Sequence, residues 1–537
     1  MKRLSVYGKP RSLPILIAVV LLTLVSINLQ AQNPNGSLRG EVQDASEARV
    51  AGAHISVQSA DSSITREATA NQSGEFRVDG LLPGRYHMVV SAPGFADATA
   101  DVEVAVSLVR DVSITLRPQA SHETVNVQAS GSSITTQPID TASAVHQGIV
   151  TSQDLVTLPL AARSFANIAY LVPGTEPVEP SDPTKARITA VAFGGSSGLN
   201  VDVSVDGGDN SDDYIGGVLQ NFSPDVVEEF AVKTAQEDAD TSRTTTGSVV
   251  ITTKRGGNDW HGTGAFYERA ADLNARYPID NPAPDPKQPF SRQNYIATIG
   301  GPLAKNKVWM FAGLEAVHEN ASISYSPDSV GEFNALSQLA ADGLVQGTGG
   351  GETLGVDTIA VPNNVRVPFR DFMGVLRFDY AQSPRSQWFL RGALDNYTTN
   401  NDLVQQATLP STGATGGSKY ENFVLSHQFT FSPRWLGNFT FDASYLHHTE
   451  TPNGHLGFSL AFPFSATFHT ISGFETFGDN LFQTPITAFP TVRNQEKYQF
   501  RYDVSHVYGK HATTFGVSFI HEPVLSGELL GSEETFI

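Results

Sequence analysis

The sequence predicts a mostly β protein with four successive parts: a signal peptide, a small β-sandwich, an α+β domain and the N-terminal part of an antiparallel transmembrane β-barrel. Three observations support this fold class. The first is a short apolar segment at the N-terminus. The second is a composition rich in turn formers, with 47 Gly and 30 Pro among 537 residues. The third is a long stretch from residue 258 onward in which apolar and polar side chains alternate.

Charge and cysteine content exclude several classes of protein. Lys+Arg is 35 and Asp+Glu is 55, so the formal net charge is −20. This acidic balance argues against nucleic-acid binding, which needs clustered Lys and Arg to neutralise phosphates. With 0 cysteines, the sequence excludes disulfide scaffolds, zinc ribbons, thiol catalysis and a lipid-anchored N-terminal cysteine. No phosphate-loop or dinucleotide-binding motif occurs, and we expect no cofactor.

Residues 1–31 have the organisation of a secretory signal peptide. Four basic residues, Lys2, Arg3, Lys9 and Arg11, precede an uncharged stretch from Ser12 to Ser26, and the small residue Ala31 follows. The alternative is a membrane anchor, but the apolar run is shorter than the ~20 residues that a spanning helix needs. We therefore predict cleavage after Ala31 and export. An exported chain that meets a bilayer again must cross it as a closed β-barrel.

Residues 36–118 read as short strands separated by turns, without a helical period. Five motifs in this segment resemble the carboxypeptidase regulatory-like domain: Gly40-Glu41-Val42 with Asp44, Ala51-Gly52-Ala53, Asn71 to Phe76, Leu82 to Tyr86, and Ala92 to Phe95. Glycines stand where turns need positive φ, and Phe76 and Tyr86 are suited to a small sandwich core. Such domains resemble carbohydrate-binding-like folds. The segment has neither a metal-ligand cluster nor a clear aromatic platform, so we favour a structural or docking role.

A short alternating segment follows at the domain junction, over residues 122–129. It looks like the TonB box of outer-membrane receptors, a strand lent to a periplasmic partner by β-augmentation. The candidate residues are Glu123, Thr124, Val125, Asn126 and Val127. The alternative interpretation is an ordinary first strand of the next domain, and the sequence leaves both open.

Residues 119–257 contain an ordered series of motifs. They are Leu158 to Phe165, Tyr170 to Gly174, Val205 to Asn210, Ser223 to Phe230, Gly247 to Asn258 and, just beyond, Trp260 to Gly262. In this order they resemble the plug of TonB-dependent receptors, specifically the Oar-like group that carries a carboxypeptidase regulatory-like domain in front. The sequence departs from this group at Ala161-Ala162, where Asn-Gly is usual, and at Gly207-Gly208, where one glycine is usual.

Two other motifs in this region have competing chemical interpretations. Gly194 to Gly198 matches the G-x-S-x-G string of serine hydrolases, but a strand rather than a helix is expected after it, so a glycine-rich loop is favoured over an esterase that uses Ser196. Five aspartates, Asp202, Asp206, Asp209, Asp212 and Asp213, lack the spacing of an EF-hand calcium loop. We predict no metal site. We predict instead a solvated loop at the apex of the plug, formed by Asp206, Asp209, Asn210, Asp212 and Asp213.

Residues 258–537 carry the strongest pattern in the chain. Phe439, Phe441 and Tyr445, for example, alternate with Thr440 and Asp442. Each run has about the ~9–11 residues of a tilted membrane strand, with an apolar face for lipid and a polar face for the lumen. Tight turns alternate with long polar loops near 317–368, 398–420 and 448–496, as in outer-membrane barrels. We predict strands near 259–269, 292–300, 308–315, 371–380, 387–397, 422–431, 435–447, 497–506 and 512–520.

Nine strands cannot enclose a plug, because a barrel of about eight strands is filled by its own side chains and a plugged lumen calls for about 22. The last residues, 533–537, do not read as a membrane strand. We therefore expect an incomplete barrel, about nine strands of 22, and an N-terminal fragment of a longer receptor or a shortened gene model. The open strand edges would favour aggregation.

The favoured function is an outer-membrane TonB-dependent receptor or transporter that imports a scarce or large solute. Oligosaccharide, siderophore, peptide and cobalamin are all open. The expected partners are outer-membrane lipid, a periplasmic TonB-type energy-transducing protein and an unknown solute, with no nucleic acid. The chain is not expected to be an enzyme. The alternative is a secreted or surface-exposed β adhesin that binds carbohydrate through the sandwich without transport.

Overall fold

The computed structural model of the chain describes most of the sandwich, the plug and the barrel strands. The described ranges are 35–118, 126–128, 146–178, 190–235, 241–275, 287–324, 346–348, 364–402, 414–452, 459–461, 491–508 and 511–529, apart from positions 63, 107, 161–162, 197, 199, 214–215, 242–243 and 288. The predicted signal peptide, residues 1–31, lies outside these ranges. Within them, no helix is long and apolar enough to cross a membrane.

The N-terminal part is a sandwich of two sheets. One has the order β4-β1-β7, formed by β1 (Gly36–Asp44), β4 (Glu75–Leu81) and β7 (Val109–Leu116). The other has the order β3-β2-β5-β6-β8, formed by β2 (His54–Ser59), β3 (Thr65–Thr69), β5 (Gly84–Ser91), β6 (Ala98–Val104) and β8 (Asn126–Gln128). Phe76 and Tyr86 are buried in the common core, as predicted. Gly74 and Gly94 have φ of 72° and 86°, which turns here require.

Strand β3 lies outside the five motifs that the sequence analysis found in the sandwich segment. Its residues, Thr65 to Thr69, include the charged Arg66 and Glu67 at its centre. The buried positions of this strand are Arg66 and Ala68, so no apolar alternation marks it. Arg66 is buried because it contacts the barrel, a reason that lies outside the local sequence.

The plug is an α+β domain around a mixed sheet of order β13-β12-β15-β14-β9. Its strands are β9 (His146–Thr151), β12 (Val201–Val205), β13 (Gly208–Asp209), β14 (Val227–Ala235) and β15 (Gly247–Thr253). The helices α2 (Ser152–Thr157) and α3 (Phe165–Ala169), the 3₁₀ turn η2 (Pro224–Val226) and the pair β10 (Thr175–Val178) and β11 (Ala190–Phe193) complete it. A capping box between Thr151 and Asp154 starts α2. Every residue of β12 and β15 is buried.

The third part is an antiparallel sheet of nine strands that is not closed. In spatial order these are β16 (His261–Ala270), β17 (Phe290–Ala304), β18 (Val308–Ser324), β20 (Asn364–Ser383), β21 (Ser386–Asp402), β22 (Ala414–Ser432), β23 (Trp435–Pro452), β25 (Thr491–Tyr508) and β26 (His511–Leu529). All nine predicted strands are therefore present, in the predicted order. The 3₁₀ turn η3 (Ala271–Leu273) follows β16, and β19 (Gln346–Thr348) pairs with β24 (Ser459–Ala461).

Apart from β16, which has 10 residues, the strands are longer than the predicted runs of about 9–11 residues. β20 has 20 residues and β23 has 18. At about 3.3 Å per residue and a tilt near 45°, 20 residues span roughly 47 Å along the membrane normal, well beyond a ~25 Å apolar band. The extra length lies largely on the side of the long connections, where β18 and β20 remain paired as far as Ser324 and Asn364. Backbone pairing there continues into sequence that alternation alone assigned to loops.

The two faces of the nine-stranded sheet differ as predicted. Inward positions are polar and buried, as for Thr440 and Asp442, while outward positions such as Phe500 and Phe519 are exposed and apolar. Near the tight-turn ends, Trp388 stacks on His427 and Trp435 stacks on His506, each with ring centroids 3.9 Å apart. Amphipathic rings at this level suit the boundary between lipid and water.

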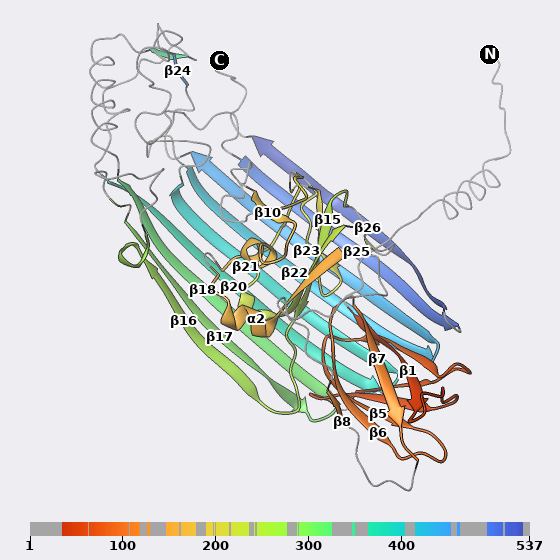
Figure 1. Cartoon of the computed structure of the whole chain (residues 1–537). Coiled ribbons are helices and arrows are strands. Elements are labelled where there is room, and N and C mark those ends of the chain that lie inside the picture. Colours follow the sequence, from red (N-terminus) through yellow and green to blue (C-terminus); the bar gives the residue numbers. More distant parts are fainter. Residues whose placement is uncertain are drawn as a thin grey trace, which may run out of the picture.

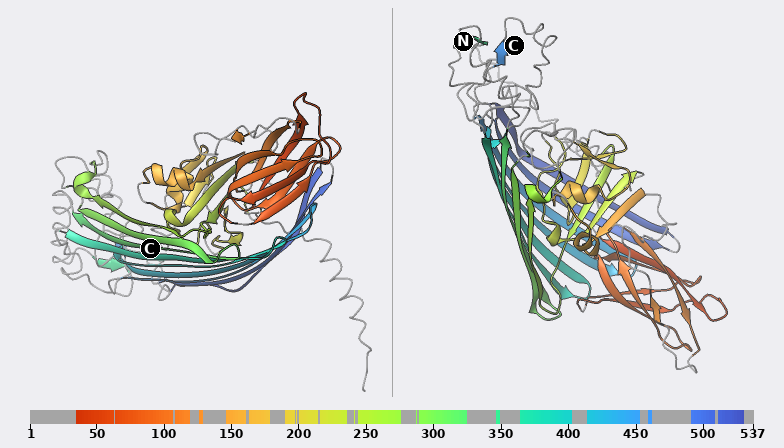
Figure 2. Two further views of the ribbon diagram at one scale, coloured as in Figure 1. Left: turned by 90° about the horizontal axis from the view of Figure 1, so that it is seen from below. Right: turned by 60° about the vertical axis from the view of Figure 1, so that its left-hand side comes forward.

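The plug lies in the concave face of the sheet, and the sandwich lies beside it at the end where the tight turns connect β20 to β21 and β22 to β23 (Figures 1 and 2). We call this the short-turn end. There the backbone N–H of Asn258 donates to the carbonyl of Asp61 at 3.0 Å. The arrangement places the plug against the polar inner wall of the sheet, where the charged groups of both meet.

Candidate functional site

The acidic segment of the plug, Asp206 to Asp213, is not the solvated loop that the sequence predicted. Asp206 is 2% exposed and Asp212 is 3% exposed, and Asp209 and Asn210 are also buried. The segment follows β12 and includes β13, and it lies against the inner face of the nine-stranded sheet. The prediction was wrong because burying carboxylates requires cationic partners, and these come from barrel strands far away in the sequence.

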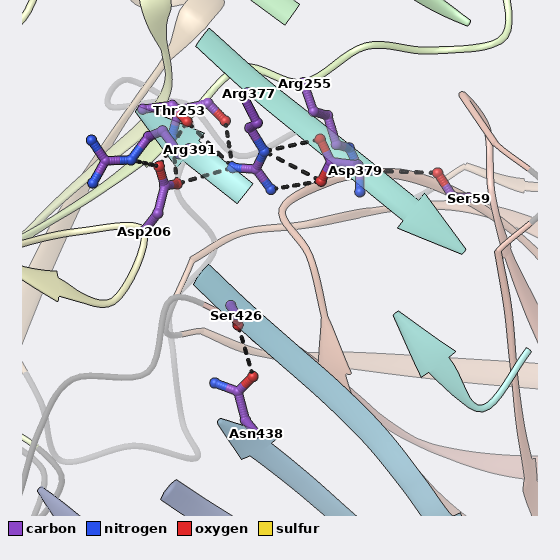
Figure 3. Close-up of polar contacts among 9 residues, drawn as sticks. All are labelled: Ser59, Asp206, Thr253, Arg255, Arg377, Asp379, Arg391, Ser426 and Asn438. Atoms are coloured by element: carbon purple, nitrogen blue, oxygen red, sulfur yellow. Dashed lines mark hydrogen bonds and ion pairs between the residues drawn. The ribbon is translucent and has the colours of Figure 1, made fainter. Parts of the chain in front are cut away.

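The first group of contacts, the Asp206 cluster, consists of Asp206, Thr253, Arg377, Asp379 and Arg391 (Figure 3). The two carboxylate oxygens of Asp206 lie 3.1 Å from Arg377 Nη1 and 2.9 Å from Arg391 Nε. Thr253 donates its backbone N–H at 2.9 Å and its hydroxyl at 2.7 Å to the same carboxylate. All three ion-paired side chains are 1% exposed, so this network is shielded from water.

Barrel residues hold Arg377 in place from its other side. Asp379, two positions further along β20, accepts from Arg377 Nε at 3.0 Å and from Nη2 at 2.9 Å. The guanidinium also lies over the ring of Phe389, 4.3 Å from its centroid. Arg377 therefore bridges one carboxylate of the plug and one of the barrel. Its contacts to Asp379 and Phe389 lie within the barrel and hold the guanidinium in place independently of the plug.

The second group, the Lys497 cluster, consists of Lys497, Asp209, Ser211, Asp213 and Glu522. The Lys497 ammonium lies 3.0 Å from Asp209, 2.5 Å from Asp213 and 3.6 Å from Glu522, and donates to the carbonyl of Ser211 at 2.8 Å. Lys497 is fully buried. One barrel cation therefore faces two carboxylates of the plug and one of the barrel.

Beside this cluster, Arg493 on β25 forms an ion pair with Asp212 at 2.7 Å. Gln499 on the same strand accepts the backbone N–H of Asp209 at 3.1 Å. Four plug carboxylates thus meet four barrel cations. The plug carboxylates are Asp206, Asp209, Asp212 and Asp213, and the cations are Arg377, Arg391, Arg493 and Lys497. The charges are complementary and fix the plug against the wall.

Sequence reasoning did not single out the four barrel cations. Their signal was present in the pattern, because Arg377 and Lys497 occupy polar positions of alternating strands, and a charge there faces the lumen. What the pattern lacks is the identity of the partner, since the Arg377 contact to Asp206 joins residues 171 positions apart.

The remaining sequence motifs do not form a chemical site. Ser196 lies in a turn between β11 and β12, and its hydroxyl accepts the backbone N–H of Phe193 at 3.1 Å. No helix follows this turn, so the strand–turn–helix elbow of a hydrolase is missing here. Among the described residues, no group of three or more His, Cys, Asp or Glu side chains has the geometry of a metal site.

The sandwich contacts both the barrel and the plug. Arg66 donates to the carbonyl of Pro384 at 3.0 Å and to Gln428, both on the barrel. Burial lowers the pKa of Arg66 to about 10. On the plug side, the backbone N–H of Val106 donates to Glu229 at 2.5 Å, and Arg255 reaches Ser59 at 3.5 Å (Figure 3).

A cleft lies where the sandwich meets the barrel, with about 430 Å³ of empty space that is partly open to solvent. Leu82 and Ile64 line it from the sandwich, and Asp379, Ser426 and Asn438 are among its barrel residues. Ser426 and Asn438 are hydrogen-bonded to each other at 3.4 Å (Figure 3). Because Asp379 belongs to both the cleft and the Asp206 cluster, the ionic network reaches from the plug to the sandwich contact.

Glu229 makes this contact sensitive to pH. Burial raises the pKa of Glu229 well above its usual range, although the Val106 N–H opposes the shift. The folded carboxyl then holds its proton where the unfolded one has lost it, so stability is full below the unfolded pKa. It falls as the pH rises toward the folded pKa, by up to about 1.4 kcal/mol per pH unit.

We therefore expect Glu229→Gln to match the wild type in unfolding temperature near pH 4 and to exceed it increasingly as the pH rises toward the raised pKa of Glu229. Thermal unfolding of the full-length protein at several pH values measures this. Glu67→Gln, at an exposed position of β3, is the control and should show no such trend. A constant difference between Glu229→Gln and wild type at all pH values would contradict the assignment.

The candidate TonB box is only partly within the described residues. Glu123, Thr124 and Val125 lie outside them. Asn126 and Val127 belong to β8, which pairs with β6 of the sandwich. The structure therefore does not place Asn126 and Val127 in the plug sheet, where the alternative interpretation expected a first strand.

Comparison with known proteins agrees with this architecture. Residues 37–117 match the carboxypeptidase regulatory-like domain family, and residues 252–341 and 351–526 match the outer membrane beta barrel domain family. The TonB-dependent transporter Oar of Myxococcus xanthus is 24% identical to the chain over 295 residues, which is 52% of this chain and 26% of that protein. The chain is thus similar to an Oar-type TonB-dependent transporter over about half of its own length. The matched region spans about a quarter of the length of that curated relative.

Solved structures similar to this chain include two outer-membrane proteins. The outer membrane transporter YddB from Escherichia coli has a TM-score of 0.48 and 11% identity, over 70% of this chain and 48% of that one. The siderophore receptor PirA from Acinetobacter baumannii has a TM-score of 0.45 and 13% identity, over the same shares of the two chains. The curated relative is named a transporter, which is consistent with the sequence prediction that this chain is not an enzyme.

Proposed function

We propose that the complete protein is an outer-membrane, TonB-dependent transporter that imports a scarce or large solute. The observation that carries the proposal is the plug, which fits the polar concave face of a sheet whose other face is apolar and is fixed there by buried ion pairs. A domain held inside a membrane barrel blocks the lumen, so solute can pass only if the domain moves. The ion pairs stabilise this closed state, and opening it requires an external input of energy.

The proposal assigns a place to each part. The signal peptide exports the chain, and the outward aromatic face contacts outer-membrane lipid. A solute such as an oligosaccharide, siderophore or peptide binds from the side of the long connections. A periplasmic TonB-type protein pulls on the candidate TonB box, residues 123–127, at the short-turn side. The homology to the Oar transporter supports this assignment.

Cell fractionation of the full-length gene product tests the location. We expect the protein in the outer-membrane fraction, extractable only with detergent. Recovery as a soluble periplasmic or secreted protein would exclude transport and would favour the adhesin alternative. Glycan-array binding by the sandwich would then be the next measurement.

Deletion of residues 123–127 tests the energy coupling. We expect loss of energised uptake with unchanged binding of solute at the cell surface, because the deleted residues are proposed to couple the protein to the periplasmic partner and not to bind the solute. The solute is first identified by screening candidate classes for binding to cells that express the protein. Deletion of residues 131–135, of equal length, is the control and should retain uptake. Normal uptake after the first deletion would refute this TonB box.

A further inference from the structure

The five-stranded sheet of the sandwich ends in a strand that comes from beyond the sandwich. β8 pairs in parallel with β6, with Thr99 opposite Asn126 and Ala100 opposite Val127. Asn126 and Val127 are the last two residues of the candidate TonB box. The sandwich therefore holds part of the segment that the proposed function assigns to the periplasmic partner.

The contact is of the kind that a strand-adding partner would also make. An edge strand such as β6 offers a row of backbone N–H and C=O groups, and an extended segment is bound by pairing with them. The ladder is only three residues long, from Asn126 to Gln128. So short a ladder has few hydrogen bonds, and each contributes little net stability because water replaces it when the strands separate. β8 can therefore be displaced without unfolding the sandwich.

The dock itself is fixed in place. The turn that follows β6 carries Ala105 and Val106, which are buried in a cluster with Ile149, Ala231 and Val250 of the plug. The Val106 N–H also donates to Glu229. The β6 edge is thus held by the plug sheet at the end nearest the β6–β7 turn.

The sandwich is also attached to the barrel, so a force that pulls on the sandwich is transmitted to the barrel as well as to the plug. Arg66 of β3 contacts Pro384 and Gln428 on the barrel. A pull on β8 while it is paired to β6 therefore acts on a domain bound to the barrel as well as to the plug. Because the barrel is embedded in the membrane, this load cannot move the plug alone. Productive pulling on the plug requires that β8 first leave β6.

We propose that the β6 edge of the sandwich is the resting dock of the coupling segment. β8 occupies it in the absence of the periplasmic partner, and strong partner binding requires its release. The inference rests on the proposed function, because it takes residues 123–127 as the segment that the partner binds. The docked fraction lowers the apparent affinity of the partner, as for any protein whose competent state is only partly populated.

A disulfide between register partners tests the dock. The chain contains no cysteine, so the double variant Thr99→Cys/Asn126→Cys adds the only two thiols to this part of the protein. In the full-length protein we expect rapid disulfide formation under mild oxidation, measured as protection of both thiols from a mass-tagged maleimide. The control is Glu67→Cys/Asn126→Cys, because Glu67 lies on β3 at the opposite edge of the same sheet. Equal reactivity of the thiols in the two pairs would overturn the dock.

The second readout is binding of the purified C-terminal domain of the organism's TonB-type protein. Oxidised Thr99→Cys/Asn126→Cys should bind it ~10-fold or more weakly than the reduced protein, since the competent fraction is removed. The control pair should be insensitive to the oxidant. Equal binding by the oxidised and reduced forms would overturn the requirement for release. If the reduced protein also fails to bind the TonB-type domain, the proposed coupling through residues 123–127 is wrong, and so is the proposal that docking controls it. Thiol protection would still establish the pairing of β8 with β6.

Discussion

Replacing Asp206 by Ala should loosen the plug by about 3–5 kcal/mol, the usual cost of removing one partner from a buried ion pair. The variant leaves the guanidinium of Arg391 buried without its ion-pair partner and leaves Arg377 with Asp379 as its remaining ion-pair partner. It also removes the acceptor of two hydrogen bonds from Thr253. Water cannot readily replace these contacts, because the side chains of Asp206 and both arginines are 1% exposed.

The measurement is the urea concentration at which full-length protein in a planar bilayer begins to conduct ions, since conduction reports the plug leaving the barrel. We expect a clearly lower midpoint for Asp206→Ala. Asp206→Asn should fall between, because the amide oxygen still accepts from Thr253 but carries no charge. The control is Asp111→Ala, which removes an exposed ion pair to Arg39, where both side chains are over 40% exposed. Exposed pairs contribute about 0–1 kcal/mol. Equal midpoints for Asp206→Ala and Asp111→Ala would show that the Asp206 cluster does not hold the plug.

The sequence predicts the sheet better than it predicts the contacts between domains. The alternation of Phe500 and Tyr502 with Arg501 and Asp503 depends only on which face of one strand meets lipid, so it can be read locally. The full length of β20 cannot, because polar residues beyond the lipid band are kept in the strand by pairing with β18, not by their own apolarity. Local pattern therefore marks the membrane-facing segment of each strand and misses its extension.

The acidic segment shows the same limit for the site. Aspartates such as Asp206, Asp209 and Asp212 also occur in solvated loops. Only their cationic partners distinguish a solvated loop from a segment that is buried against the barrel wall. Those partners lie on β20, β21 and β25, strands that begin well over a hundred residues later in the chain. The best sequence signal was the presence of Arg377 and Lys497 at lumen-facing positions. Cations on an inner wall predict an anionic occupant, and the acidic segment of the preceding domain is one.

Replacing Lys497 by Met should produce the second large effect, again about 3–5 kcal/mol against plug retention. The methionine keeps most of the side-chain volume but removes the ammonium that Asp209, Asp213 and Glu522 share. Carboxylates from the plug and the barrel would then repel one another in a buried site. The same urea-dependent conductance measures the change, and we expect a lower midpoint than that of the wild type.

The matched control is Lys419→Met, the same substitution on another barrel strand. Lys419 forms an ion pair with Glu421, but both side chains are more than half exposed, so its loss should change little. A double variant adds the decisive comparison. If Lys497 acts mainly through Asp209, then Asp209→Asn should cost less in the Lys497→Met background than in the wild type, by about 0.5–3 kcal/mol. Strict additivity of the two substitutions would mean that Lys497 does not act through Asp209. Its hold on the plug would then depend on Asp213.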